Sequence, residues 1–139
     1  MPIVDDIAGL QQILAASRTL AVVGLSAQWH RPSYFAAKYM QDHGYRVIPV
    51  NPRYTEVLGE VSYPNLRSIP EPVDLVDCFR KSEEIPALAD DAIAIGAKVL
   101  WMQLGIESDE SAQRALAARL AVVSNRCVTF GRPRIRGGL

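Results

Sequence analysis

The chain has 139 residues, of which 49% are hydrophobic and 22% charged, as expected of one domain with one core. Fifteen basic and fifteen acidic residues give a formal net charge of zero at pH 7, so no overall field attracts nucleic acid or an anionic membrane. Neither a secretory signal nor an apolar run long enough to span a membrane is present, so we expect a single cytoplasmic domain over residues 1–139.

Apolar runs rich in β-branched residues alternate with segments of helical period along the chain. In chain order we predict helix 4–16, strand 20–23, helix 32–42, strand 46–50, strand 73–79, helix 83–95, strand 98–102, helix 108–118 and strand 121–123. Pro32 suits the first position of its helix, and Gly44 stands where that helix should stop. The proline-rich stretch 52–72 predicts a long loop with at most a short strand near Val61 and a helical turn near Leu66.

This alternation predicts an α/β fold, a Rossmann-like doubly wound parallel sheet of about five strands with helices on both faces, in three layers. Ligands of such sheets bind beyond the carboxyl ends of the strands, where the strand order reverses. Four segments should therefore converge on one crevice, namely residues 24–33, 51–53, 79–81 and 103–105.

The segment after the first strand predicts a site for a phosphate. The first N–H groups of a helix have no partners within the helix and carry the positive end of its dipole. The hydroxyls of Ser26 and Ser33 can add hydrogen bonds. Of the Gly-x-Gly-x-x-Gly pattern of nicotinamide sites, only Gly24 is present, because Ser26 and Trp29 stand at the other two glycine positions.

The residues after the second strand indicate the kind of nucleotide. Proteins that bind NAD place a carboxylate there to bind the ribose hydroxyls, whereas this chain has Asn51, Pro52 and Arg53. A cation without a carboxylate favours an extra phosphate near the ribose, as in NADP or coenzyme A (CoA). A solvated surface charge is the alternative interpretation of Arg53.

Four motifs in fixed order carry a family resemblance. They are Val-Val-Gly-Leu-Ser at 22–26 with Arg-Pro-Ser at 31–33, Val-Ile-Pro-Val-Asn-Pro at 47–52, residues 69–77 with Phe-Arg at 79–80, and residues 94–105. Over residues 10–128 the chain resembles the stand-alone bacterial CoA-binding proteins. These are similar to the N-terminal domain of the succinyl-CoA synthetase α-subunit.

The resemblance implies a small module that binds CoA or an acyl-CoA. The ligand-binding residues that it implies are Gly24, Leu25, Ser26, Arg31, Pro32, Ser33, Asn51, Pro52, Arg53, Phe79, Arg80, Gln103 and Gly105. The loop after the first strand would line the diphosphate, residues 51–53 the adenosine phosphate and residues 79–80 the adenine. Residues 103–105 would face the pantetheine or close the pocket. We expect no catalytic residue, because the synthetase domain that holds the phosphorylated histidine has no counterpart in this sequence.

Three alternatives stay open. An NADP-dependent oxidoreductase would use the same crevice, and Tyr34 and Lys38 have the spacing of a Tyr-x-x-x-Lys pair, although they follow the phosphate-binding loop too closely to serve a nicotinamide. A CoA-binding subunit of a multi-chain acyl-CoA ligase would need a partner subunit. An RNA-binding tail around Arg132, Arg134 and Arg136 has three charges but no interleaved aromatic residues, so we expect no nucleic-acid partner.

The remaining chemistry-bearing residues favour structural roles. Cys78 and Cys127 lack Cys-x-x-Cys spacing, and both are expected to be unreactive thiols, with a redox role of Cys78 beside Arg80 and Lys81 as the weaker alternative. His43 should stabilise a helix end, and His30 has no recognisable catalytic partner.

Replacing Gly24 by valine is expected to block ligand binding while the domain stays folded.

Overall fold

The computed structural model describes residues 3–128. Its elements are α1 (Ile7–Ala16), β1 (Thr19–Val23), α2 (Pro32–Asp42), β2 (Arg46–Val50), β3 (Glu56–Val57), β4 (Glu60–Val61), the 3-10 helix η1 (Leu66–Ser68), β5 (Leu75–Cys78), the 3-10 helix η2 (Ser82–Glu84), α3 (Ile85–Ala94), β6 (Val99–Met102), α4 (Asp109–Ala117) and β7 (Ala121–Val123). None of the helices in this part of the chain is long and apolar enough to cross a lipid bilayer.

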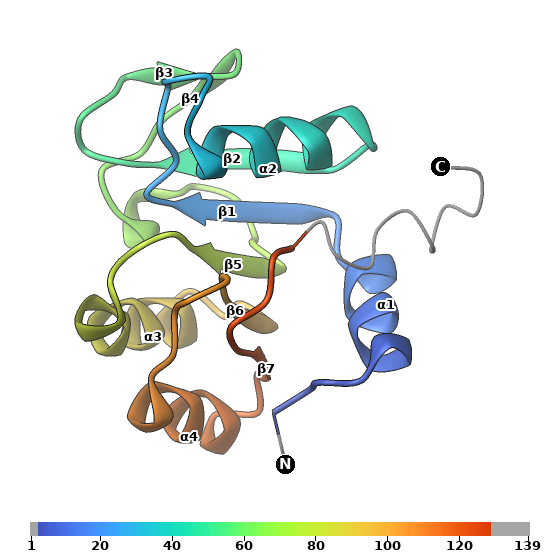
Figure 1. Cartoon of the computed structure of the whole chain (residues 1–139). Coiled ribbons are helices and arrows are strands. Elements are labelled where there is room, and N and C mark those ends of the chain that lie inside the picture. The colour runs from blue at the N-terminus through green and yellow to red at the C-terminus, as the bar shows by residue number, and fades with distance from the viewer. Residues whose placement is uncertain (1–2, 129–139) are drawn as a thin grey trace.

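Five strands form one parallel sheet in the order β2-β1-β5-β6-β7, which confirms the predicted fold class (Figure 1). The chain first moves from β1 to β2 on one side and later returns to the other side of β1 with β5. The strand order therefore reverses between β1 and β5. In doubly wound folds this is the point at which ligands bind.

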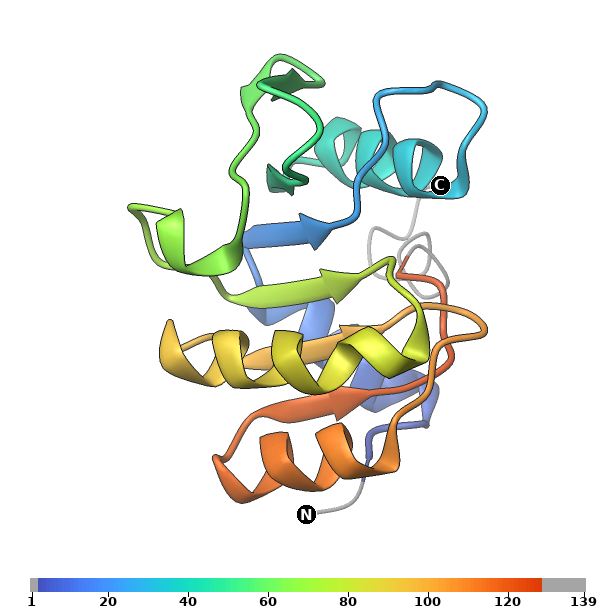
Figure 2. The same cartoon turned by 90° about the vertical axis from the view of Figure 1, so that its left-hand side faces the viewer.

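Helices cover both faces of the sheet, with α1 and α2 on one face and α3 and α4 on the other (Figures 1 and 2). Successive side chains of a strand point to opposite faces, so each strand contributes to two cores. In β1, Ala21 and Val23 pack with α3 and α4, whereas Leu20 and Val22 pack with α1 and α2. Burial on both faces explains why the strands appear as continuous apolar runs in the sequence.

The main difference from the predicted elements lies in the proline-rich stretch. The short strand near Val61 is confirmed, but it pairs with a second two-residue strand, β3, in a small antiparallel hairpin that the sequence did not predict. The helical turn near Leu66 is η1. The predicted strand 73–79 is shorter, because only Leu75–Cys78 pairs with β1 and β6.

Candidate functional site

A cleft with a volume of about 640 Å³ lies beyond the carboxyl ends of β1, β2 and β5, where the strand order reverses. This volume is within the usual range for small-molecule sites. The cleft is lined by Gly24, Ser26, Gln28, Arg31, Pro32, Ser33, Asn51, Pro52, Arg53, Tyr54, Phe79 and Arg80. The structure thus brings together every residue predicted from the three loops except Leu25, and adds Gln28 and Tyr54.

Of the three predicted residues that the cleft does not include, Leu25 and Gly105 have structural positions. Leu25 has a fully buried side chain in the core under α1 and α2, so only its main chain belongs to the loop. Gly105 lines none of the described cavities, and its N–H donates to Asn125 Oδ1 at 2.6 Å. The positive φ of Gly105, 85°, accounts for a glycine in this turn.

Asn51 joins the loop after β1 to the loop after β2. The side chain is only 9% exposed. Its Nδ2 donates to the Leu25 carbonyl at 3.2 Å, and its Oδ1 accepts from the Arg53 N–H at 3.0 Å. A carboxylate at this position has no hydrogen to donate to Leu25. The packing of the two loops therefore accounts for an amide at this position.

The loop between β1 and α2 is ordered by serine hydroxyls. The Ser26 N–H donates to Ser33 Oγ at 3.0 Å, and the Gln28 N–H donates to Ser26 Oγ at 3.0 Å. At the start of α2, Arg31 provides no side-chain cap and Pro32 takes the first position. By contrast, Asp6 caps α1. The first turn of α2 thus keeps uncapped N–H groups beside the cleft.

Gly24 allows the loops after β1 and β5 to approach each other closely. Its φ is 87°, and a Cβ built on it would overlap the Phe79 carbonyl oxygen and lie 3.3 Å from Arg80 Nε. The glycine is therefore required by the fold itself. An added Cβ at Gly24 would clash with backbone rather than with ligand, so we expect Gly24→Val to destabilise the domain as well as to block ligand binding.

Three arginines give the cleft its charge. Arg31, Arg53 and Arg80 line it, and among the described residues no aspartate or glutamate does. None of the three forms an ion pair with another described residue. Within residues 3–128, the only hydrogen bond of Arg31 to another side chain runs from its Nε to Gln28 Oε1 at 3.3 Å. These guanidinium groups are suited to bind phosphate, which accepts paired hydrogen bonds.

Tyr54 closes the side of the cleft near β2. Hydrogen bonds with Ser26 and with the Ala27 main chain lower the pKa of the Tyr54 hydroxyl, and the charges of Arg53 and Arg31 lower it further. Tyr54 follows a proline-rich turn and belongs to no regular element. Its place in the cleft therefore depends on loop geometry that no sequence periodicity indicates.

A second cavity of about 580 Å³ adjoins the cleft and shares Pro32, Phe79 and Arg80 with it. Gln103, predicted to face the pantetheine, lines this second cavity rather than the cleft. The Gln103 side chain is 3% exposed, and its Nε2 donates to Asp77 Oδ1.

Asp77 is a buried acid under these cavities. It lies in β5 and is 1% exposed, and no cation pairs with it among the described residues. Burial raises its pKa from 3.8 to about 7, although the hydrogen bond from Gln103 acts in the opposite direction. The sequence signal was an aspartate inside an apolar strand, and the prediction assigned it no role.

The other candidate groups lie apart from the cleft. Tyr34 and Lys38 line a separate small cavity on α2, where Lys38 forms an ion pair with Asp42, so they do not reach the crevice of an oxidoreductase. His43 stacks on Tyr39, which supports its structural role. The His30 ring contacts Trp29 edge to face.

The two thiols differ in exposure. Cys78 is fully buried, and its pKa is raised by desolvation, which removes the redox alternative. Cys127 lines the second cavity.

No group of three His, Cys, Asp or Glu residues suited to a metal ion occurs within 3–128. The predicted basic tail, Arg132, Arg134 and Arg136, lies outside the described residues.

Comparisons with known proteins agree with this geometry. Residues 18–133 match the model of a family described as the CoA binding domain. The chain is 38% identical over 121 residues to the YneT protein of Bacillus subtilis, covering 87% of this chain and 90% of that protein. A solved structure from Pyrococcus horikoshii OT3 is 34% identical, with a TM-score of 0.92 and coverage of 99% of this chain and 98% of the other.

A larger enzyme contains a related segment. The chain is 31% identical over 74 residues to the ADP-forming acetate–CoA ligase I of Archaeoglobus fulgidus, which is 53% of this chain and 11% of the ligase. The family match covers most of the chain, including the loops after β1, β2 and β5 that form the cleft. The chain therefore belongs to the CoA-binding domain family, as the sequence resemblance implied.

Proposed function

We propose that this protein binds coenzyme A or an acyl-CoA in the cleft, as a small binding module. The observation that carries the proposal is the set of three arginines, Arg31, Arg53 and Arg80, facing one cleft without a carboxylate among its described lining residues. CoA carries a diphosphate and a 3′-phosphate, so its charge matches a site with several cations. Membership of the CoA-binding domain family supports the same ligand.

The diphosphate fits the loop between β1 and α2. The uncapped first turn of α2 offers N–H groups and the positive end of the helix dipole to an anion. Arg31 stands at the start of this helix, and Arg80 Nε lies close to Gly24 on the opposite side. A phosphate between them would receive hydrogen bonds from backbone and from guanidinium groups.

The adenosine 3′-phosphate fits the side of the cleft formed by residues 51–54. Arg53 supplies the cation there, and the rings of Pro52 and Tyr54 supply apolar surface for the adenine. In this arrangement Phe79, which lies between the two cavities, meets the start of the pantetheine rather than the adenine expected from the resemblance. Asn51 stands where NAD-binding proteins have a carboxylate for the ribose hydroxyls, and both polar groups of its side chain bond to the protein instead.

Thermal unfolding with and without ligand tests the proposal. CoA at about one hundred times its dissociation constant should stabilise the domain by roughly 2.7 kcal/mol, a shift of several degrees in Tm. NAD and NADH should give no comparable shift, because they lack the third phosphate. Equal stabilisation by NAD would contradict the assignment, and a larger shift with NADP than with CoA would favour the oxidoreductase-like alternative.

The match to a segment of an ADP-forming acetate–CoA ligase favours a second candidate function. The chain would then act as the CoA-binding subunit of a ligase whose nucleotide-activating subunit is a separate protein. Affinity purification of the tagged chain from its native cells, followed by mass spectrometry, tests this candidate. A stoichiometric ATP-grasp partner would support it, and recovery of the chain alone with bound CoA would favour the independent module.

A further inference from the structure

The second cavity is lined mainly by apolar side chains, whereas the cleft is lined by three arginines. The lining of the second cavity includes the side chains of Phe35, Ala36, Phe79, Leu104, Ile106 and Cys127, and no aspartate or glutamate among the described residues. Because Pro32, Phe79 and Arg80 line both cavities, a ligand held by its phosphates in the cleft can continue into this one.

Two large apolar side chains at this cavity are exposed to water. Phe35 of α2 is 66% exposed, and Leu104 of the loop after β6 is 71% exposed. Apolar groups that flank a cavity in this way gain stability when an apolar ligand covers them. Their position beside the proposed phosphate site argues for the distal end of the same ligand as the occupant.

The polar groups of the second cavity are few. Arg80 lies with its Nε near Gly24, at the phosphate end, and Lys81 is exposed to solvent at the rim. Gln103 is buried with its Nε2 bonded to Asp77, and its Oε1 has no hydrogen-bond partner among the described residues. This acceptor suits an amide N–H, which the pantetheine arm of CoA carries.

Resting on the proposed function, we propose that the second cavity takes the pantetheine arm with an uncharged aliphatic acyl group, so that the protein selects aliphatic acyl-CoA thioesters. It should prefer them to free CoA and to thioesters whose acyl group ends in a carboxylate. Each methylene that enters an apolar cavity favours binding, whereas a carboxylate there loses its water without gaining a buried cation.

Calorimetric titration at fixed salt with CoA, acetyl-CoA, butyryl-CoA and succinyl-CoA tests this inference. Two added methylenes at about fourfold each should make butyryl-CoA roughly 15-fold tighter than acetyl-CoA. Succinyl-CoA, of the same chain length as butyryl-CoA, should bind no tighter than acetyl-CoA. Equal affinities for all four ligands, or a preference for succinyl-CoA, would overturn the inference and leave CoA binding intact. Failure of every ligand to bind would instead overturn the proposed function together with it.

A pair of matched variants locates the effect. Leu104→Ser removes an exposed side chain from the second cavity, and Val61→Ser removes one that is 60% exposed on β4, away from both cavities. Leu104→Ser should weaken the binding of butyryl-CoA several-fold more than the binding of CoA, because both ligands place the pantetheine arm in this cavity and only butyryl-CoA adds an apolar acyl group. Val61→Ser should change neither. Loss of the same factor for CoA and butyryl-CoA in Leu104→Ser, or an equal change in both variants, would contradict the assignment of the acyl group to this cavity.

Discussion

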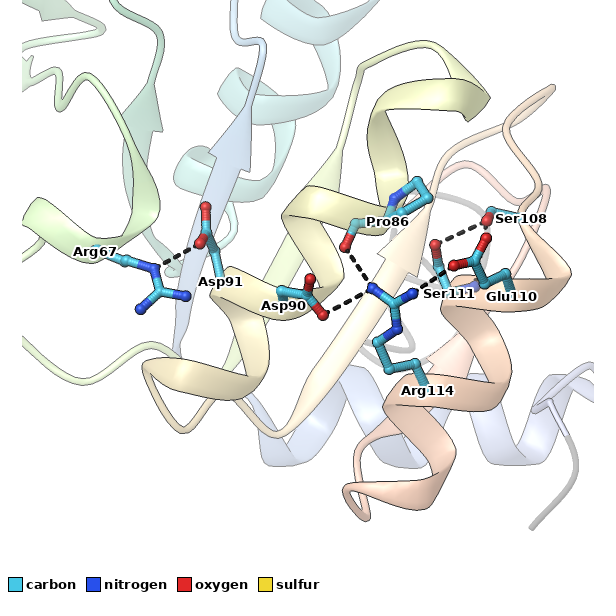
Figure 3. A network of polar contacts seen from close by, with 8 residues as sticks. All are labelled: Arg67, Pro86, Asp90, Asp91, Ser108, Glu110, Ser111 and Arg114. Atoms are coloured by element: carbon cyan, nitrogen blue, oxygen red, sulfur yellow. Dashed lines mark hydrogen bonds and ion pairs between the residues drawn. The ribbon is translucent and has the colours of Figure 1, made fainter.

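The arginines of the cleft and those of the α3–α4 surface have opposite surroundings. On the α3–α4 surface, Arg114 bonds to Asp90, Glu110 and the Pro86 carbonyl, and Arg67 bonds to Asp91 at 2.6 Å (Figure 3). Neither region is deeply buried, so burial does not explain the difference. Paired arginines of this kind join elements of the fold, in this case α4 and η1 to α3.

In the cleft, Arg31, Arg53 and Arg80 come from three different loops, and none of them pairs with an acid among the described residues. Like charges that share a cleft repel one another, and an anion bound between them relieves this repulsion. The comparison therefore teaches that one set pairs with acids of neighbouring elements, whereas the other has no acidic partner among the described residues, as the proposed phosphate site requires.

The largest expected effect concerns the backbone that shapes the cleft. Gly24→Ala should destabilise the domain by roughly 2 to 5 kcal/mol, because it adds a left-handed residue and a clash with the Phe79 carbonyl. Chemical denaturation measures this change in the free energy of unfolding.

Gly96→Ala is the matched control for Gly24→Ala. Gly96 also has a positive φ, 75°, but nothing lies within 4 Å of its added Cβ. Gly96→Ala should lower the free energy of unfolding by only roughly 1 to 2 kcal/mol, which is the cost of a left-handed backbone without any clash. Equal losses in the two variants would mean that contact between the loops after β1 and β5 does not fix the cleft.

Removing one arginine from each region sharpens the comparison directly. Arg80→Ala should weaken CoA binding by about 10- to 100-fold, since a charge-assisted hydrogen bond contributes roughly 1.5 to 3 kcal/mol. Arg114→Ala should leave CoA affinity unchanged. Titration calorimetry of both variants at the same salt concentration measures the difference. A similar loss in both variants would show that the effect reflects net charge rather than the cleft.

Like the cleft arginines, Asp77 has no partner of opposite charge in the part of the chain that the structure describes, whereas Asp90 and Asp91 each pair with an arginine. Its pKa is raised to about 7, so the folded state holds the proton more tightly than the unfolded state. The stability it contributes is complete below about pH 4, falls by up to about 1.4 kcal/mol per pH unit as pH rises, and levels off above about pH 7.

Asp77→Asn removes this titration while keeping the shape of the side chain. The free energy of unfolding of the variant should therefore change less between pH 5 and pH 8 than that of the wild type. Denaturant unfolding at several pH values gives both curves. Parallel curves for variant and wild type would mean that Asp77 is ionised in the folded protein throughout this range.

The smallest effect is expected on the α3–α4 surface itself. Arg114→Ala should lower the free energy of unfolding only slightly, because exposed ion pairs are screened by water and salt. Added salt should reduce the difference from wild type. A loss of several kcal/mol would mean that this network does more than hold α4 to α3.

Most of the fold could be predicted from the sequence, because its signals are local. Helix α2 and strand β2 match their predicted ranges residue for residue, since Pro32 and Gly44 mark the helix and an apolar run marks the strand. The β3–β4 hairpin was missed because each strand has two residues, too few for a period of two to appear.

The candidate site was predictable where it follows strand ends and not where it depends on side-chain packing. Loop positions such as Arg53 and Arg80 follow from topology alone, because parallel strands end at one edge of the sheet. The bond between Gln103 and Asp77 joins two strands, and Tyr54 reaches the cleft through an irregular turn. No local sequence pattern encodes either arrangement. The burial of the Leu25 side chain could likewise not be predicted, because the residue lies in a loop without periodicity.

The central claim is that the cleft arginines bind the phosphates of CoA, and Arg53 with the 3′-phosphate tests it most directly. Wild type and Arg53→Ala are titrated calorimetrically with CoA and with dephospho-CoA at one salt concentration. We predict that the variant binds CoA about 10- to 100-fold more weakly and binds dephospho-CoA as the wild type does. An equal loss for both ligands would place Arg53 on the diphosphate, and no loss for either would contradict the proposed placement of the ligand.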